Sequence, residues 1–162
     1  MTVYVYSMYG LGGRMWSSAI KDYVCETVSH IPGTKVANTL GFTQWRSIVE
    51  QIKKQPAGSK TVIVGHSMGA SAATYPTDEV KVDLIVCYDC AGQAPVGIAK
   101  NAGKLLDFWD RSWAIVPKYR PWAYNGYANR ISQTITYDGH TGQPSDPKLL
   151  GIVVQEVKKL VK

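Results

Sequence analysis

The chain has 162 residues, 45% of them hydrophobic and 19% charged, which is the size and composition of one ordinary folded domain. This composition excludes disordered and collagen-like chains, and no apolar run approaches the roughly 18 residues that a membrane-spanning helix needs. The net charge of +6 comes from basic residues scattered along the chain, so we expect a solvated basic surface and no nucleic-acid partner.

Short β-rich runs alternate with amphipathic stretches along the chain. In order, the predicted strands span residues 2–8, 34–38, 60–64, 82–88, 104–109 and 130–137. The third and fourth runs are almost continuously apolar, as in strands that are buried on both faces of a parallel sheet.

Apolar residues recur at helical spacing between these strands. The first predicted helix shows the pattern at Trp16, Ala19, Ile20, Tyr23 and Val24. The second shows it at Trp45, Ile48, Val49 and Ile52, with Thr43 as the expected N-cap. The last begins at Asp146-Pro147 and has its stripe at Leu150, Val153, Val154, Val157 and Leu160. The alternation predicts a single α/β domain over residues 1–162, with a doubly wound, mostly parallel six-stranded sheet and helices on both faces.

A G-x-S-x-G motif follows the third predicted strand directly. It reads Gly65-His66-Ser67-Met68-Gly69 and leads into a stretch of small residues. At such a strand-to-helix turn a serine projects its hydroxyl beyond the sheet, and the flanking glycines let neighbouring backbone pass closely. The motif therefore predicts a nucleophilic serine at position 67. The alternative is a serine in a tight turn with no chemical role.

With this motif inside an α/β pattern, the chain resembles a very small α/β-hydrolase of the lipase, esterase and thioesterase kind. The resemblance extends from the first strand to the last helix. It implies a serine hydrolase whose catalytic residues follow in the order Ser, Asp or Glu, His. Only a short segment separates the fourth and fifth predicted strands, so we expect no cap domain and an open site.

The chain has three histidines, and the resemblance assigns the general base to one of them. His30 ends the first predicted helix, where we expect it to hydrogen-bond terminal carbonyls. His66 precedes Ser67, and we expect its side chain to point away from the serine hydroxyl. His140 follows the last strand, where the fold carries its general base. A loop histidine without a role is the alternative for His140.

Two aspartates are candidates for the acid that orients His140. Asp89 directly follows the strand at 82–88, and some lipase-like proteins carry their acid there. Asp110 follows the next strand, which is the commoner position in the fold. We favour Asp89 and keep Asp110 as the alternative acid, with Asp138, or a dyad without an acid, as the remaining possibilities.

The glycine-rich segment after the first strand is the candidate oxyanion loop. In Tyr9-Gly10-Leu11-Gly12-Gly13, tyrosine stands where the resemblance would place histidine. The backbone N–H groups of Leu11 and Met68 are the expected oxyanion donors. Residues 108–127 hold seven aromatic side chains: Phe108, Trp109, Trp113, Tyr119, Trp122, Tyr124 and Tyr127. We expect this segment to form an aromatic lip in which Trp109 and Trp113 contact substrate, and core covering is the alternative. Tyr9, in the glycine-rich loop, is a further expected substrate contact.

No cofactor or metal site is evident in the sequence. Met15 occupies the third glycine position of a would-be G-x-G-x-x-G loop, so no cofactor is expected. Cys87 and Cys90 form a single C-x-x-C, which is too little for a zinc site. The odd number of cysteines and the lack of a secretory pattern predict a reducing compartment, the cytoplasm.

These features together predict a serine hydrolase that cleaves small carboxylic esters, or thioesters, through an acyl-enzyme. One alternative is a hydrolase of another acyl bond, such as an amide or a polymer-linked ester. The other is a non-catalytic binding module on the same fold, since a fold does not establish activity. The oligomeric state is not predicted.

Overall fold

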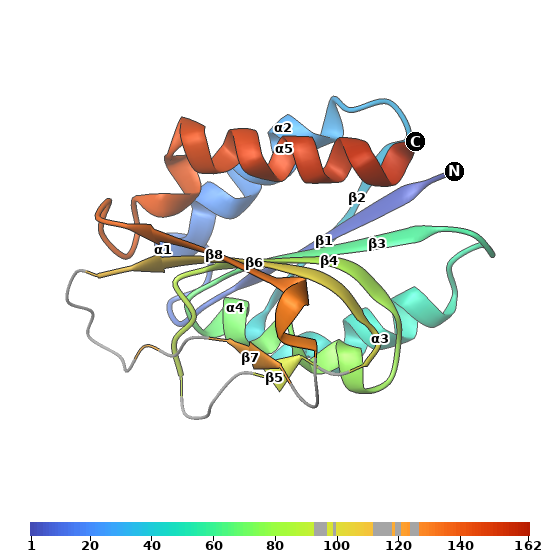
Figure 1. Cartoon of the computed structure of the whole chain (residues 1–162), viewed down its shortest axis with the longest axis horizontal. Coiled ribbons are helices and arrows are strands. Elements are labelled where there is room, and N and C mark those ends of the chain that lie inside the picture. Colours follow the sequence, from blue (N-terminus) through green and yellow to red (C-terminus); the bar gives the residue numbers. More distant parts are fainter. Residues whose placement is uncertain (93–96, 99, 112–117, 119–120, 124–126) are drawn as a thin grey trace.

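A computed structural model describes the chain apart from residues 93–96, 99, 112–117, 119–120 and 124–126, and apart from the side chains of residues 16, 122–123 and 127–128. Its centre is a six-stranded sheet with the order β2-β1-β3-β4-β6-β8 (Figure 1). Every neighbouring pair in this sheet is parallel. The strands are β1 (Val3–Tyr9), β2 (Thr34–Gly41), β3 (Lys60–His66), β4 (Val82–Tyr88), β6 (Ala102–Asp110) and β8 (Ile131–Thr136).

The most apolar strands lie at the centre of the sheet. β3 and β4 are almost wholly buried, because helices cover both of their faces, whereas the edge strands β2 and β8 alternate between exposed and half-buried positions. All six predicted strands are present. β2 runs to Gly41 and β6 begins at Ala102, beyond the predicted limits, because pairing with a neighbour extends a strand further than its own β-propensity indicates.

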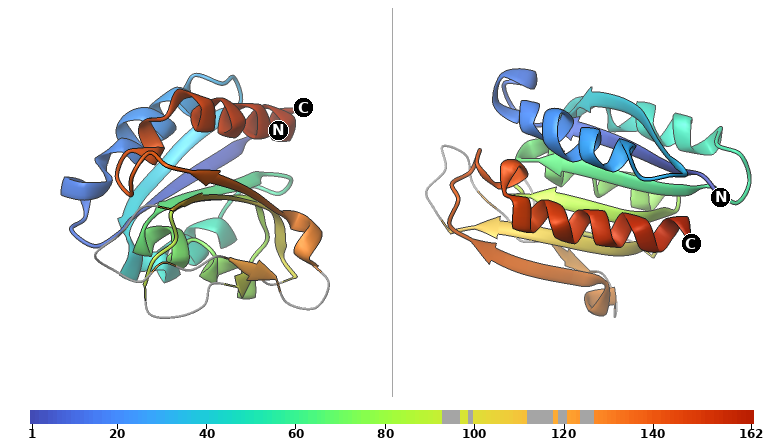
Figure 2. Two further views of the ribbon diagram at one scale, coloured as in Figure 1. Left: turned by 60° about the vertical axis from the view of Figure 1, so that its left-hand side comes forward. Right: turned by 90° about the horizontal axis from the view of Figure 1, so that it is seen from above.

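Helices cover the two faces of the sheet, as the sequence predicts (Figures 1 and 2). One face carries α1 (Arg14–Ala19), the π-helical segment η1 (Ile20–Cys25), α2 (Glu26–Ser29) and α5 (Pro147–Val161). The other carries α3 (Trp45–Lys53), α4 (Met68–Ala72) and a small sheet of β5 (Gly97–Ile98) and β7 (Trp122–Ala123). Short 3-10 turns connect these elements: η2 (Phe42–Gln44), η3 (Tyr75–Asp78), η4 (Tyr127–Arg130) and η5 (Gln143–Ser145). Within the described ranges, no helix has the length and apolar character needed to cross a membrane.

Each face of the sheet has its own apolar core, because successive side chains of a strand point to opposite faces. Val62 and Val64 belong to the first core and Ile63 to the second. Helical residues complete the first core: Ile20, Val24, Val28, Leu149, Val153 and Val157. Ile48 and Ala70 complete the second. The sheet therefore buries apolar side chains on both faces.

Two helix predictions need correction. The first predicted helix is interrupted, since Ser17 has non-helical angles (φ −125°, ψ 15°) and Tyr23 is 54% exposed. At this position the Ser17 hydroxyl forms hydrogen bonds with the Gly10 N–H and the His66 ring. Thr43 is not the N-cap of α3, because it lies inside a 3-10 turn in which the Gln44 side chain accepts the Gly41 N–H at 3.0 Å. Asp146 does cap α5, since its carboxylate accepts the Lys148 N–H at 2.7 Å.

Candidate active site

Ser67 occupies a strained turn between β3 and α4. Its backbone angles, φ 57° and ψ −126°, lie in a region that residues other than glycine rarely adopt. Two hydrogen bonds hold the turn against the segment that follows β4. The Ser67 N–H donates to the Tyr88 carbonyl at 2.9 Å, and the Ala91 N–H donates to the Ser67 carbonyl at 3.2 Å. Residue 67 is therefore fixed at the carboxyl edge of the sheet, directly beside Asp89.

The two motif glycines are required by close packing. A Cβ on Gly65 would collide with the backbone of Gly69 and Ala70, at the start of α4. A Cβ on Gly69 would collide with the Met8 carbonyl at the end of β1. The two glycines thus let α4 pack closely against both β3 and β1, and the chain can turn sharply from β3 into α4.

Asp89 and His140 form a hydrogen-bonded pair at the same edge. The distance from Asp89 Oδ2 to His140 Nδ1 is 2.5 Å, and the Asp89 side chain is fully buried. β4 borders β3, so Asp89 reaches this position from the strand next to that of Ser67. His140 comes from the loop between β8 and α5, which folds back over the strand ends. The structure therefore pairs Asp89 with His140 at the edge of the sheet that also carries the Ser67 turn.

Asp110 is the last residue of β6, and its side chain binds the backbone of the His140 loop. Its Oδ2 accepts the Gly139 N–H at 2.9 Å and the Thr136 hydroxyl at 3.2 Å. The carboxylate that accepts a hydrogen bond from the His140 imidazole is that of Asp89. Asp110 thus holds the backbone beside His140, a role that the sequence analysis did not foresee.

Lys118 adds a buried cation to this group, also unforeseen. Its side chain is 10% exposed, and its Nζ lies 2.9 Å from Asp89 Oδ2 and 3.7 Å from Asp110 Oδ1. It also donates to the Asp110 carbonyl at 3.0 Å. A buried carboxylate needs compensation for lost hydration, and Lys118, with His140 and the Asp110 N–H at 3.2 Å, supplies it to Asp89. No motif marks this lysine, because its partners lie far away in the sequence.

His66 supports the His140 loop from the opposite side. Its Nε2 lies 2.6 Å from the His140 carbonyl and its Nδ1 lies 2.9 Å from the Ser17 hydroxyl. A carbonyl can only accept, so Nε2 carries the proton and Nδ1 accepts the Ser17 O–H. The Gly10 N–H in turn donates to Ser17 Oγ at 3.3 Å. Burial lowers the pKa of His66 from 6.5 to about 4, so this neutral tautomer persists at neutral pH. The sequence analysis predicted only that the His66 side chain points away from the Ser67 hydroxyl, and it missed the hydrogen bonds to Ser17 and to the His140 carbonyl.

The glycine-rich loop after β1 passes directly beside Ser67. A Cβ placed on Gly10 would lie 2.8 Å from the Ser67 Cβ and 3.2 Å from the Met68 nitrogen. Leu11 follows at the surface, 48% exposed. The loop that carries the Leu11 N–H therefore lies next to the turn that carries the Met68 N–H.

The structure describes some of the aromatic side chains considered for substrate contact. Tyr9 packs against the first core, which lies under α2 and α5. Phe108 is fully buried against Tyr88, with ring centroids 5.0 Å apart, so this ring belongs to the core. Trp109 is a half-buried residue of β6, and Trp113 lies outside the described residues.

His30 has the structural place expected of it, at the end of the first helical region. The His30 Nδ1 donates to the Glu26 carbonyl at 2.8 Å near the end of α2. Cys25, Cys87 and Cys90 are free and buried.

Solved structures share this arrangement of strands and helices. A cutinase-like protein from Cryptococcus sp. has a TM-score of 0.59 and 14% identity, over 99% of this chain and 95% of its own. An α/β serine hydrolase without a lid from Xanthomonas campestris has a TM-score of 0.62 and 13% identity, over 96% and 81%. This chain has the α/β-hydrolase fold. An acetyl xylan esterase also matches, with a TM-score of 0.57 and 13% identity over 99% of each chain.

Sequence comparison alone does not reveal this likeness. No family model matches the chain, and no curated protein does. The α/β-hydrolase fold is present here in a small form, and only residues 89–101 connect β4 to β6, which is too few for a lid domain at that place.

Proposed function

We propose that this protein is a serine hydrolase that cleaves carboxylic esters, including thioesters, through an acyl-enzyme. The main support is the Asp89–His140 hydrogen bond of 2.5 Å at the sheet edge where Ser67 occupies its strained turn. A serine, an imidazole and a buried carboxylate are the groups that nucleophilic acyl transfer uses.

Each residue has one role in the proposed mechanism. Ser67 Oγ attacks the acyl carbon while His140 takes its proton, and Asp89 holds the imidazole by Nδ1 and stabilises the imidazolium that forms. The Leu11 and Met68 N–H groups stabilise the oxyanion. When the tetrahedral intermediate collapses, His140 returns the proton to the leaving alcohol or thiol. A water molecule, activated by His140, then attacks the acyl-enzyme and releases the acid.

A fluorophosphonate probe tests the nucleophile directly. We expect one covalent adduct, located on Ser67 by mass spectrometry, and its loss in Ser67→Ala. Ser132→Ala, at an exposed position of β8, is the matched control and should be labelled like the wild type. A folded protein that forms no adduct would favour the binding-module alternative. Turnover of amides but not of esters would favour a hydrolase of another acyl bond.

Paired substitutions test the acid. Asp89→Asn should leave His140 with the wrong tautomer, a change that lowers turnover by about 10⁴ in a serine protease. Asp110→Asn should cause a much smaller loss, because Asp110 binds the backbone of the loop. Turnover of one soluble ester is measured for both variants after their melting temperatures are compared. A large loss in Asp110→Asn with near-normal Asp89→Asn would reverse the assignment.

A further inference from the structure

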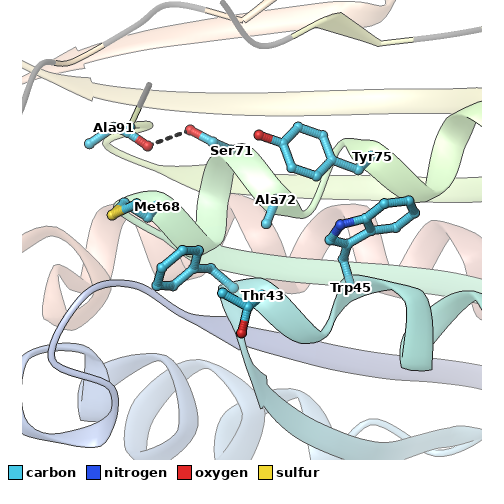
Figure 3. Close-up of a pocket in the computed structure, with 9 residues that line it drawn as sticks. Thr43, Trp45, Met68, Ser71, Ala72, Tyr75 and Ala91 are labelled. Carbon is cyan, nitrogen blue, oxygen red and sulfur yellow. Dashed lines mark hydrogen bonds between the residues drawn. The ribbon is translucent and has the colours of Figure 1, made fainter. Parts of the chain in front are cut away.

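A cavity of about 240 Å³ lies beside the Ser67 turn, on the face of the sheet that carries α3 and α4 (Figure 3). Its walls come from three segments that each begin at the carboxyl edge of a strand: the turn after β2, the start of α4, and the segment after β4. The main lining side chains are Phe42, Trp45, Met68, Ala72 and Tyr75.

The cavity shares a wall with the candidate active site. Met68 immediately follows Ser67, and its N–H is a proposed oxyanion donor. Ala91, which also lines the cavity, donates its N–H to the Ser67 carbonyl at 3.2 Å, and its carbonyl accepts the Ser71 hydroxyl at 2.7 Å. A Cβ on Gly92 would lie 3.8 Å from Met68 Cγ, so these walls meet next to the turn. A group attached to the reacting carbonyl is therefore within reach of the cavity.

The lining is chemically suited to an apolar group. Trp45 and Tyr75 pack edge to face, with ring centroids 5.7 Å apart, and Met68 adds a soft thioether surface. The Ser71 hydroxyl is directed at the Ala91 carbonyl (Figure 3). No charged side chain lines the cavity among the described residues, so a charged group would lose its hydration there without a partner. A cavity of about 150 Å³ is enough to hold benzene, and this one is larger.

We propose that this cavity binds a compact apolar group, of the size of a phenyl ring, attached to the acyl or the alcohol part of the ester. This inference rests on the proposed function and narrows its substrate class to esters with a bulky apolar substituent near the scissile bond. A simple acetate of a small alcohol leaves the cavity unfilled and gains nothing from it.

Three esters and two variants test the proposal by kinetics. Ethyl phenylacetate carries the ring on the acyl part, benzyl acetate carries it on the alcohol part, and ethyl acetate carries none. We expect kcat/KM for one of the aryl esters to exceed that for ethyl acetate by about tenfold or more. Ala72→Leu, which fills the cavity, should reduce this ratio by a similar factor. Tyr23→Ala changes an exposed tyrosine of η1, whose buried residues belong to the first core, and should leave the ratio unchanged.

The outcome identifies which part of the ester occupies the cavity. If Ala72→Leu lowers kcat/KM for ethyl phenylacetate relative to ethyl acetate, the acyl group occupies the cavity. If it lowers kcat/KM for benzyl acetate relative to ethyl acetate, the alcohol part does. Equal kcat/KM for all three esters in the wild type would overturn the proposal. The proposal would also be overturned if Ala72→Leu, labelled by the fluorophosphonate as fully as the wild type, kept the same preference for the aryl ester over ethyl acetate.

A binding measurement separates this inference from the proposed function. Ethyl phenylacetate and benzyl acetate are each titrated into Ser67→Ala protein while the NMR signals of the Met68 methyl and the Trp45 indole are followed, and the expected result is a response to at least one of the two esters. We expect saturable shifts at both signals and their loss when Ala72→Leu is added. Absence of shifts overturns the cavity proposal whether or not Ser67 is a nucleophile. Shifts without any fluorophosphonate adduct in the wild type would support the cavity and refute the hydrolase.

Discussion

His66 should make the protein less stable in acid. Its imidazole is buried, accepts a hydrogen bond from Ser17 and donates one to the His140 carbonyl, and its pKa is lowered from 6.5 to about 4, chiefly by burial. Above pH 6.5 neither the folded nor the unfolded chain binds a proton here. As the pH falls from 6.5 to 4, the unfolded chain gains a proton that the folded chain excludes, so the free energy of unfolding falls.

The magnitude follows from the pKa difference. One pKa unit corresponds to about 1.4 kcal/mol, so a shift from 6.5 to about 4 amounts to about 3 kcal/mol once the pH is well below 4. Most of this loss, about 2 to 3 kcal/mol, should appear between pH 7.5 and pH 4.5.

Urea unfolding of the wild type and His66→Gln across this pH range measures the effect. The amide side chain of the variant can still donate to the His140 carbonyl but does not titrate. The variant should be less stable at pH 7.5, and its disadvantage should shrink by about 2 to 3 kcal/mol at pH 4.5. His30→Gln replaces an exposed histidine and should keep the wild-type pH dependence.

A difference between wild type and His66→Gln that stays constant from pH 7.5 to pH 4.5 would refute the reasoning. If the variant does not fold, an NMR titration of the wild-type His66 ring tests the same point. The ring should show no protonation between pH 7.5 and pH 5.5. A midpoint near 6.5 would mean that the ring is not enclosed as the structure shows.

Two further predictions use matched pairs of variants. Lys118→Met leaves two buried aspartates without their cation and should lower the free energy of unfolding by about 3 to 5 kcal/mol, whereas Lys104→Met removes a more exposed ion pair and should change it by about 1 kcal/mol at most. Urea unfolding at pH 7 compares the two, and equal losses would contradict the buried cluster. Gly69→Ala forces a Cβ against a backbone carbonyl of β1 and should lose at least about 2 kcal/mol, whereas Gly151→Ala places its Cβ in open space within α5 and should gain up to about 1 kcal/mol. Thermal melts compare these variants, and a Gly69→Ala protein that melts at or above Gly151→Ala would refute the packing argument.

The sequence by itself determined the elements of the fold. Continuous apolar runs such as that of β4 predict buried parallel strands, and the helical stripe that begins at Asp146 predicts α5 with its cap. These signals are local, because each depends on residues a few positions apart. The same holds for the turn at Ser67, since the two glycines that flank it are themselves the mark of close backbone packing. The interrupted first helix escaped prediction because Ser17 departs from helical angles where its hydroxyl joins a hydrogen-bond network that reaches Gly10 and His66.

Only the tertiary structure decided which groups meet at the edge of the sheet. Asp89 directly follows β4 and Asp110 ends β6, and the sequence favoured Asp89 without excluding Asp110. The folded chain gives Asp89 the imidazole of His140 and gives Asp110 the backbone of the same loop. Lys118 and His66 have no signal in the sequence, because their partners lie many residues away. Such contacts depend on where the loops lie over the strand ends. The packing of the whole sheet decides this, and no pattern of neighbouring residues in the sequence predicts it.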